Sequence, residues 1–178
     1  MTQKYQKFDQ KPIARDKFDR IFKLMDFSGI GGEYCGVYVL PFLKRAPSCK
    51  FIWGLPSTGC DYTDQYIGCE CALALLCSIT VVVEGDVPYG PDPVPSDLFS
   101  IYEGLYATLS IPSLEDYALG FWTTIQGFID LALNSPRLHA ETLDRLRELA
   151  HSPHLIRERF GLVLAGYSPP EILSSLSL

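Results

Sequence analysis

The sequence YCGVYVLPFL spans Tyr34–Leu43, and FIWGL follows at Phe51–Leu55 after the polar stretch Lys44–Lys50. Aromatic and β-branched residues dominate both stretches, as is typical of strands. Two such stretches around a short polar segment predict an antiparallel hairpin with a seven-residue loop. Pro41 has no backbone N–H to donate, which places the first strand at a sheet edge near that residue.

The residues after the hairpin predict one further strand and then a series of helices. The β-branched run ITVVVE at Ile79–Glu84 predicts a third strand, preceded by a helix over Thr63–Ser78. The Pro-rich stretch Gly85–Ser96 predicts an extended loop. Apolar periodicity predicts helices over Asp97–Ser110, Ser113–Leu133, Pro136–Ala150, Pro153–Ala165 and Pro169–Leu176.

Serine side chains are expected to cap several of these helices. Ser135, Ser152 and Ser168 each precede a proline, whose fixed φ suits the first helical position. Ser113 and Asp116 have the spacing of a capping box. The sequence therefore predicts an α+β fold: a small antiparallel sheet of two or three strands, within residues 34–84, packed against a mainly helical C-terminal half.

The N-terminal end differs in composition from the remainder. Met1–Ala14 is polar, lacks an apolar period and carries three lysines, so it predicts a flexible basic arm. Residues 15–178 are expected to form a single globular domain that begins with an amphipathic helix over Arg15–Phe27. The first residues contain no apolar stretch, so we expect no signal peptide. The longest charge-free hydrophobic runs have thirteen residues, fewer than the roughly 20 that cross a bilayer. We therefore expect a cytoplasmic protein.

Charge is segregated along the chain. Residues 1–50 hold ten Lys/Arg and five Asp/Glu, residues 51–135 hold eleven acids and no Lys, Arg or His, and residues 136–178 hold five of each sign. These segments contribute +5, −11 and 0, which sum to the net charge of −6. Either the basic N-terminal part compensates the acidic middle locally, or the middle presents an acidic surface to a basic partner.

The second interpretation provides candidate partner-binding residues. Acids in or beside the expected loops are Asp61, Asp64, Asp86, Asp92, Asp97 and Glu103. Nucleic-acid-handling proteins and nuclease toxins are natural basic partners, so the hypothesis is a non-enzymatic inhibitor of the immunity or anti-defence type. Direct binding of nucleic acid by this segment is disfavoured, because contacts to phosphate need cations.

One stretch of the chain resembles an enzyme family. Gln65 stands six residues before Cys71 at an expected helix, a spacing similar to that of papain-like cysteine proteases. In that family the glutamine helps to form the oxyanion hole, and the helix start lowers the pKa of the thiol. The resemblance implies a hydrolase that uses Cys71 with a distant histidine such as His139. Ala72 stands where the family carries an aromatic residue, and a buried structural cysteine is the competing interpretation.

No metal or cofactor site is expected. Cys69 and Cys71 are two residues apart and would face different sides of a helix, and His151 and His154 straddle a Ser-Pro helix boundary. The glycine-rich segment 29–33 lacks the Lys-Ser/Thr of a phosphate loop.

A third hypothesis for the function is a structural homo-oligomer. The helix expected over Ser113–Leu133 is apolar nearly all round, which suits either a central core helix or an interface between two copies of the chain.

Overall fold

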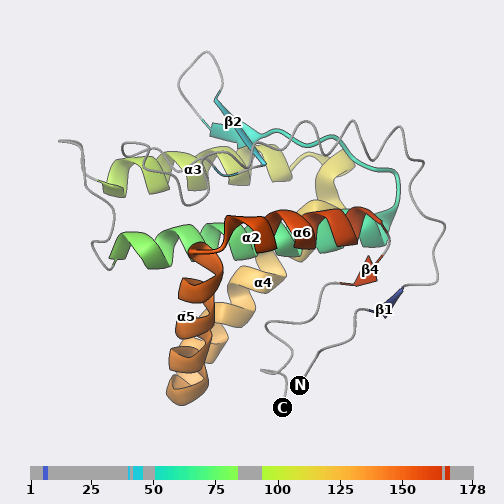
Figure 1. Ribbon diagram of the computed structural model, residues 1–178. Coiled ribbons are helices and arrows are strands. Elements are labelled where there is room, and N and C mark those ends of the chain that lie inside the picture. The colour runs from blue at the N-terminus through green and yellow to red at the C-terminus, as the bar shows by residue number, and fades with distance from the viewer. Residues whose placement is uncertain are drawn as a thin grey trace.

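Figure 1 shows the computed structural model, which describes residues 6–7, 40, 42–45, 51–83, 94–165 and 167–168. The strands are β1 (Gln6–Lys7), β2 (Leu43–Arg45), β3 (Phe51–Trp53) and β4 (Tyr167–Ser168). The helices are α2 (Asp61–Val83), α3 (Val94–Leu109), the short 3-10 helix η1 (Pro112–Leu114), α4 (Glu115–Asn134), α5 (Pro136–Ala150) and α6 (Pro153–Leu164). The predicted α+β class is confirmed: an antiparallel hairpin precedes a mainly helical C-terminal half. The helices predicted over Arg15–Phe27 and Pro169–Leu176 lie outside the described residues.

Strands β2 and β3 form the predicted hairpin. Their antiparallel register pairs Leu43 with Trp53 and Arg45 with Phe51. Phe51 and Trp53 are buried while Ile52 between them is exposed, which is the alternation of a strand with one face on the core. The predicted boundary was wrong, because β2 continues through Leu43–Arg45 into the stretch assigned to the turn. The first part of the predicted strand, residues 34–39, lies outside the described residues.

The two ends of the described chain meet in a second, very short ladder. Gln6 pairs with Ser168 and Lys7 pairs with Tyr167, both antiparallel. Two residues of the predicted N-terminal arm therefore lie beside the segment that follows α6.

The third predicted strand is wrong, because α2 continues as one helix from Asp61 to Val83. β-branched residues lose side-chain freedom in a helix, but the cost is only a few tenths of a kcal/mol per residue. Helix packing overrides this weak preference. Thr80 is buried, and its hydroxyl donates a hydrogen bond of 2.8 Å to the carbonyl of Leu76, one turn earlier in the helix.

The C-terminal helices lie close to their predicted positions, but their starts differ in detail. α3 begins at Val94, inside the stretch assigned to the loop, with Pro95 in its first turn, where a missing N–H costs nothing. The predicted capping box was wrong: Ser113 lies within η1, and Leu114 occupies the cap position of α4 without a side-chain hydrogen bond. Pro136 and Pro153 begin α5 and α6 as predicted, but the preceding serines cap through no side-chain bond.

Helix α2 is the centre of the fold. In Figure 1 it runs across the middle of the molecule, with α3 and the hairpin on one side of it and α4 and α5 reaching away on the other. It packs against α4, α5 and α6. Ile67 and Cys71 on α2 and Tyr117 and Phe121 on α4 are among the most deeply buried side chains, and they belong to one continuous core.

Two glycines allow α2 and α4 to approach each other closely. A Cβ atom on Gly68 would lie 2.3 Å from the carbonyl oxygen of Tyr117, and one on Gly120 would lie 1.9 Å from that of Gln65. Carbon and oxygen atoms do not approach this closely without a bond, so only glycine permits this helix pair. The same holds between α3 and the hairpin, where a Cβ on Gly104 would lie 1.5 Å from the carbonyl oxygen of Phe51.

Candidate partner-binding face

The structure describes four of the six acids that were predicted to bind a partner. Asp61 is exposed at the start of α2, whereas Asp64, one turn later, is buried. Asp97 and Glu103 lie in α3, and Glu103 is exposed. Asp86 and Asp92 lie outside the described residues. Among the described acids, Asp64 is therefore not part of an exposed surface.

Asp64 is buried because its carboxylate holds the loop that enters α2. It accepts hydrogen bonds from the Ser57 hydroxyl at 2.6 Å, from the Thr58 backbone N–H at 2.9 Å, and from the Thr58 hydroxyl. Gly59 follows in this loop with φ of 76°, a conformation that favours glycine. A negative charge near the first turn of α2 also interacts favourably with the helix dipole. These contacts give Asp64 a structural role.

Replacing Asp64 with Ala should lower the free energy of unfolding by about 1–3 kcal/mol, because the Ser57 hydroxyl and the buried backbone N–H and hydroxyl of Thr58 would lose their hydrogen bonds to this carboxylate. Asp61 provides the matched control, since it is an exposed acid in the same turn. Asp61→Ala should cost about 0.3–1 kcal/mol through the helix dipole alone. Urea denaturation of both variants measures the difference, and equal losses would contradict the structural role of Asp64.

Acidic side chains converge where α2 and α4 begin. Asp116 lies close enough to Asp61, Asp64 and Glu115 for their charges to act on it. Desolvation is the largest cause of the raised pKa of Asp116, and these three carboxylates raise that pKa further. The two helices therefore start at a common acidic end of the molecule.

Along their lengths, α3 and α4 expose large apolar side chains. Those of α3 are Phe99, Tyr102 and Tyr106, spaced along one side of the helix. Those of α4 are Leu119, Ile129 and Leu133, also on one side, with the half-buried Trp122 among them. The two rows join where the Tyr102 ring meets the edge of Trp122, with ring centroids 5.9 Å apart. We call these seven residues the α3–α4 face.

The exposed charges on these two helices are all negative. Glu103 lies on α3 beside the tyrosines, and Glu115 and Asp130 lie on α4 and are exposed like the leucines. No Lys, Arg or His occurs between Phe51 and Ser135. The α3–α4 face therefore combines exposed aromatic and aliphatic side chains with a negative border. The contact between Tyr102 and Trp122 brings the two rows together at one point, and exposed apolar side chains that gather in this way mark interaction sites.

The structure argues against Cys71 as a nucleophile. Its side chain is 0% exposed in the centre of α2, and burial raises the pKa of its thiol well above the ordinary value, which disfavours the reactive thiolate. Gln65 lies on the same helix, and its backbone carbonyl oxygen faces Gly120 of α4. His139 lies on α5, where its ring packs against that of Phe128 with ring centroids 4.9 Å apart. Cys71 and His139 therefore take part in helix packing, and the buried Cys71 thiol is not accessible from solvent.

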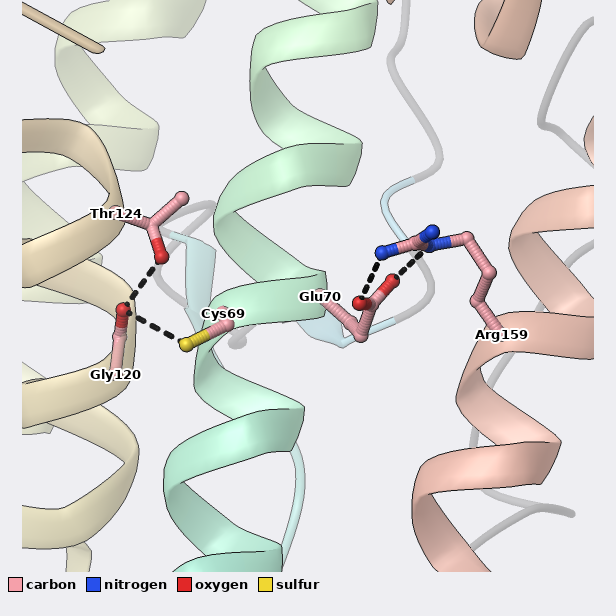
Figure 2. Close-up of polar contacts among 5 residues, drawn as sticks. All are labelled: Cys69, Glu70, Gly120, Thr124 and Arg159. Atoms are coloured by element: carbon pink, nitrogen blue, oxygen red, sulfur yellow. Dashed lines mark hydrogen bonds and ion pairs between the residues drawn. The ribbon is translucent and has the colours of Figure 1, made fainter. Parts of the chain in front are cut away.

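A buried ion pair joins α2 and α6, and it was not predicted from the sequence. Figure 2 shows Arg159 and Glu70 joined by two hydrogen bonds, Nε to Oε2 and Nη2 to Oε1, each 2.6 Å long. Glu70 is 2% exposed and Arg159 is buried as well. The partners are 89 positions apart in the sequence. Neither a glutamate nor an arginine in a helix can be identified as buried from the sequence alone. Through this pair, a cation of α6 neutralises one of the acids in residues 51–135.

Figure 2 also shows how α2 and α4 are joined beside this pair. The Cys69 thiol donates to the carbonyl oxygen of Gly120 at 3.5 Å, and the Thr124 hydroxyl donates to the same oxygen at 2.9 Å. Burial raises the pKa of the Cys69 thiol, so it remains a neutral donor. Both contacts are structural and lie away from the α3–α4 face.

Three further findings bear on function. Within the part of the chain that the structure describes, no group of three or more His, Cys, Asp or Glu side chains could hold a metal ion. None of the described helices has the length and apolar character required to span a membrane. The chain matches no known family model, and neither the curated proteins nor the solved structures compared with it include a significant match.

Proposed function

We propose that this protein is a cytoplasmic, non-enzymatic binding protein whose α3–α4 face docks onto a basic surface of another protein. An inhibitor of the immunity or anti-defence type is the form of this function that we favour. The observation that carries the proposal is the composition of the face: exposed aromatic and aliphatic side chains bordered by Glu103, Glu115 and Asp130, on helices without a cation.

The physical argument combines two effects. Burying the exposed apolar side chains in a complex would contribute roughly 25 cal/mol per Å² of area removed from water. The surrounding carboxylates attract a positively charged partner, raise the association rate and repel acidic proteins and nucleic acids. Tyrosine and tryptophan are also enriched among the residues that contribute most to protein–protein binding.

A homo-oligomer is the second candidate, and one observation favours it. Leu119, Ile129 and Leu133 on α4 are all more than half exposed, Leu133 at 74%. In a symmetric contact, however, each copy would bring its own Glu115 and Asp130 towards those of the other. Like charges placed together oppose association, so a basic partner suits this face better than a second copy. Static light scattering over a range of concentrations distinguishes the two.

The test of the proposed function is a capture experiment with two variants of equal charge. One variant carries Glu103→Lys, Glu115→Lys and Asp130→Lys on the α3–α4 face. The control carries Glu141→Lys, Asp144→Lys and Glu148→Lys, which reverse three exposed acids of α5. Circular dichroism checks that both retain their helices. We expect wild type and control to capture the same basic protein from the native cell extract, and the face variant to lose it.

The control makes the result interpretable. Both variants shift the net charge by the same amount, so a general loss of electrostatic attraction would affect them equally. If the face variant captures the partner as well as wild type does, or if both variants lose it together, the proposed docking face is wrong.

A further inference from the structure

The centre of the α3–α4 face is a pair of stacked tyrosines. Tyr102 and Tyr106 are one turn apart on α3, and their rings lie 6.3 Å apart with an interplanar angle of 20°. Their side chains are 53% and 61% exposed, and Phe99, one turn earlier, is 64% exposed. Three aromatic rings therefore point into solvent along one side of one helix.

The tyrosine pair is anchored to the core. Tyr102 packs edge-on against Trp122, and Trp122 packs edge-on against Phe121 with ring centroids 4.9 Å apart. Phe121 is fully buried between α2 and the hairpin residue Trp53. The Tyr102 ring is thus held in place by Trp122 and the Tyr106 ring stacks on it, so ordering this pair on binding would cost little side-chain entropy.

The negative charge around the rings favours a positively charged ligand. Glu103 follows Tyr102 directly and lies one turn before Tyr106, so it borders the ring pair on the helix surface. Aromatic rings carry negative potential on their faces, and the nearby carboxylate has the same sign. A second copy of this face, a nucleic acid or an acidic lipid surface would add negative charge to this site. A cation matches it.

We propose that the tyrosine pair recognises arginine side chains of the basic protein partner, by stacking of the planar guanidinium on the exposed rings beside Glu103. This inference rests on the proposed function and specifies the chemistry of the partner. Arginine fits better than lysine, because the guanidinium is flat, weakly hydrated and able to stack on an aromatic face while it donates to a carboxylate. The ammonium of lysine is a strongly hydrated point charge.

The experiment compares two synthetic amphipathic peptides of equal length and charge. Both carry leucine on one helical side, and the polar positions are arginine in one and lysine in the other. Binding to the full chain is followed by fluorescence anisotropy of a dye on the peptide. Emission from Trp122 is a second, local signal, because this half-buried ring contacts Tyr102 while the other tryptophan, Trp53, lies in the core. We expect the arginine peptide to bind about three- to tenfold more tightly.

Three variants test whether the preference for the arginine peptide depends on the rings of Tyr102 and Tyr106. Tyr102→Leu with Tyr106→Leu keeps apolar area but removes the rings, and should abolish the arginine preference while the affinity for the lysine peptide changes less than twofold. Tyr102→Phe with Tyr106→Phe keeps the rings and should retain the preference. Tyr62→Leu removes a tyrosine of equal exposure on α2 and should have no effect.

The outcomes separate this inference from the proposed function. Equal affinity for the two peptides, or an arginine preference that survives loss of both rings, overturns the arginine inference. If both peptides then still bind and lose affinity on reversal of Glu103, Glu115 and Asp130, the proposed function stands without it. If neither peptide binds, or light scattering shows that the face joins two copies of the chain, both proposals are wrong.

Discussion

Replacing Glu70 with Gln should lower the free energy of unfolding by about 3–5 kcal/mol, the usual cost of removing one member of a buried ion pair. The buried guanidinium of Arg159 would lose the negative charge of Glu70, and the amide of Gln could accept only one of the two hydrogen bonds of 2.6 Å. The pair also joins α2 to α6, so its loss should loosen the C-terminal helix. Urea denaturation followed by circular dichroism measures the change.

Two controls define the origin of this effect. Glu141→Gln breaks the exposed ion pair with Arg137 on α5, and should cost less than about 1 kcal/mol. The double variant Glu70→Leu with Arg159→Met replaces the buried pair by apolar side chains, and should recover most of the stability. If the double variant were less stable than Glu70→Gln, the argument from the lost partner charge of Glu70 would be wrong.

Replacing Gly120 with Ala should destabilise the protein by about 1–3 kcal/mol or more, as overpacking does in well-packed cores. In most helices this change is favourable by about 0.5–1 kcal/mol, because alanine restricts the unfolded chain. Here the new Cβ would lie 1.9 Å from the carbonyl oxygen of Gln65. The two backbones would have to separate, and the contacts between Tyr117, Phe121 and α2 would weaken with them.

Gly127 on the same helix is the matched control for this prediction. A Cβ at Gly127 would have no atom within 4 Å among the described residues, and the position is exposed. Gly127→Ala should therefore raise the thermal midpoint by a few degrees, while Gly120→Ala lowers it. Changes of the same sign in the two variants would show that the close approach of α2 and α4 does not limit the packing.

Local sequence signals were sufficient to place most of the elements. The aromatic and branched residues at Phe51–Leu55 marked a strand, because its buried face alternates with an exposed one. Prolines at 136 and 153 marked helix starts, because a proline at the first helical position loses no hydrogen bond. The strand prediction at Ile79–Val83 was wrong. These β-branched residues have a local preference for a strand, but packing against other helices outweighs it.

The candidate site could be predicted only in part. The lack of cations between residues 51 and 135 is a property of the sequence, but the acids selected from it were assigned to loops, and Glu115 and Asp130 of α4 were not among them. The burial of Asp64 was not predictable, because its partners Ser57 and Thr58 resemble ordinary loop residues. The apolar face was also missed, since an exposed Tyr102 and a buried Tyr117 look alike until the helices are packed.

The most direct test of the docking face is the ratio of two dissociation constants for the partner that wild type captures. One belongs to the Glu103→Lys, Glu115→Lys, Asp130→Lys variant and the other to the Glu141→Lys, Asp144→Lys, Glu148→Lys control, both measured at about 0.1 M salt. Three reversed charges within the contact should weaken binding by roughly tenfold or more relative to the control. A ratio near one would contradict a docking face on α3 and α4.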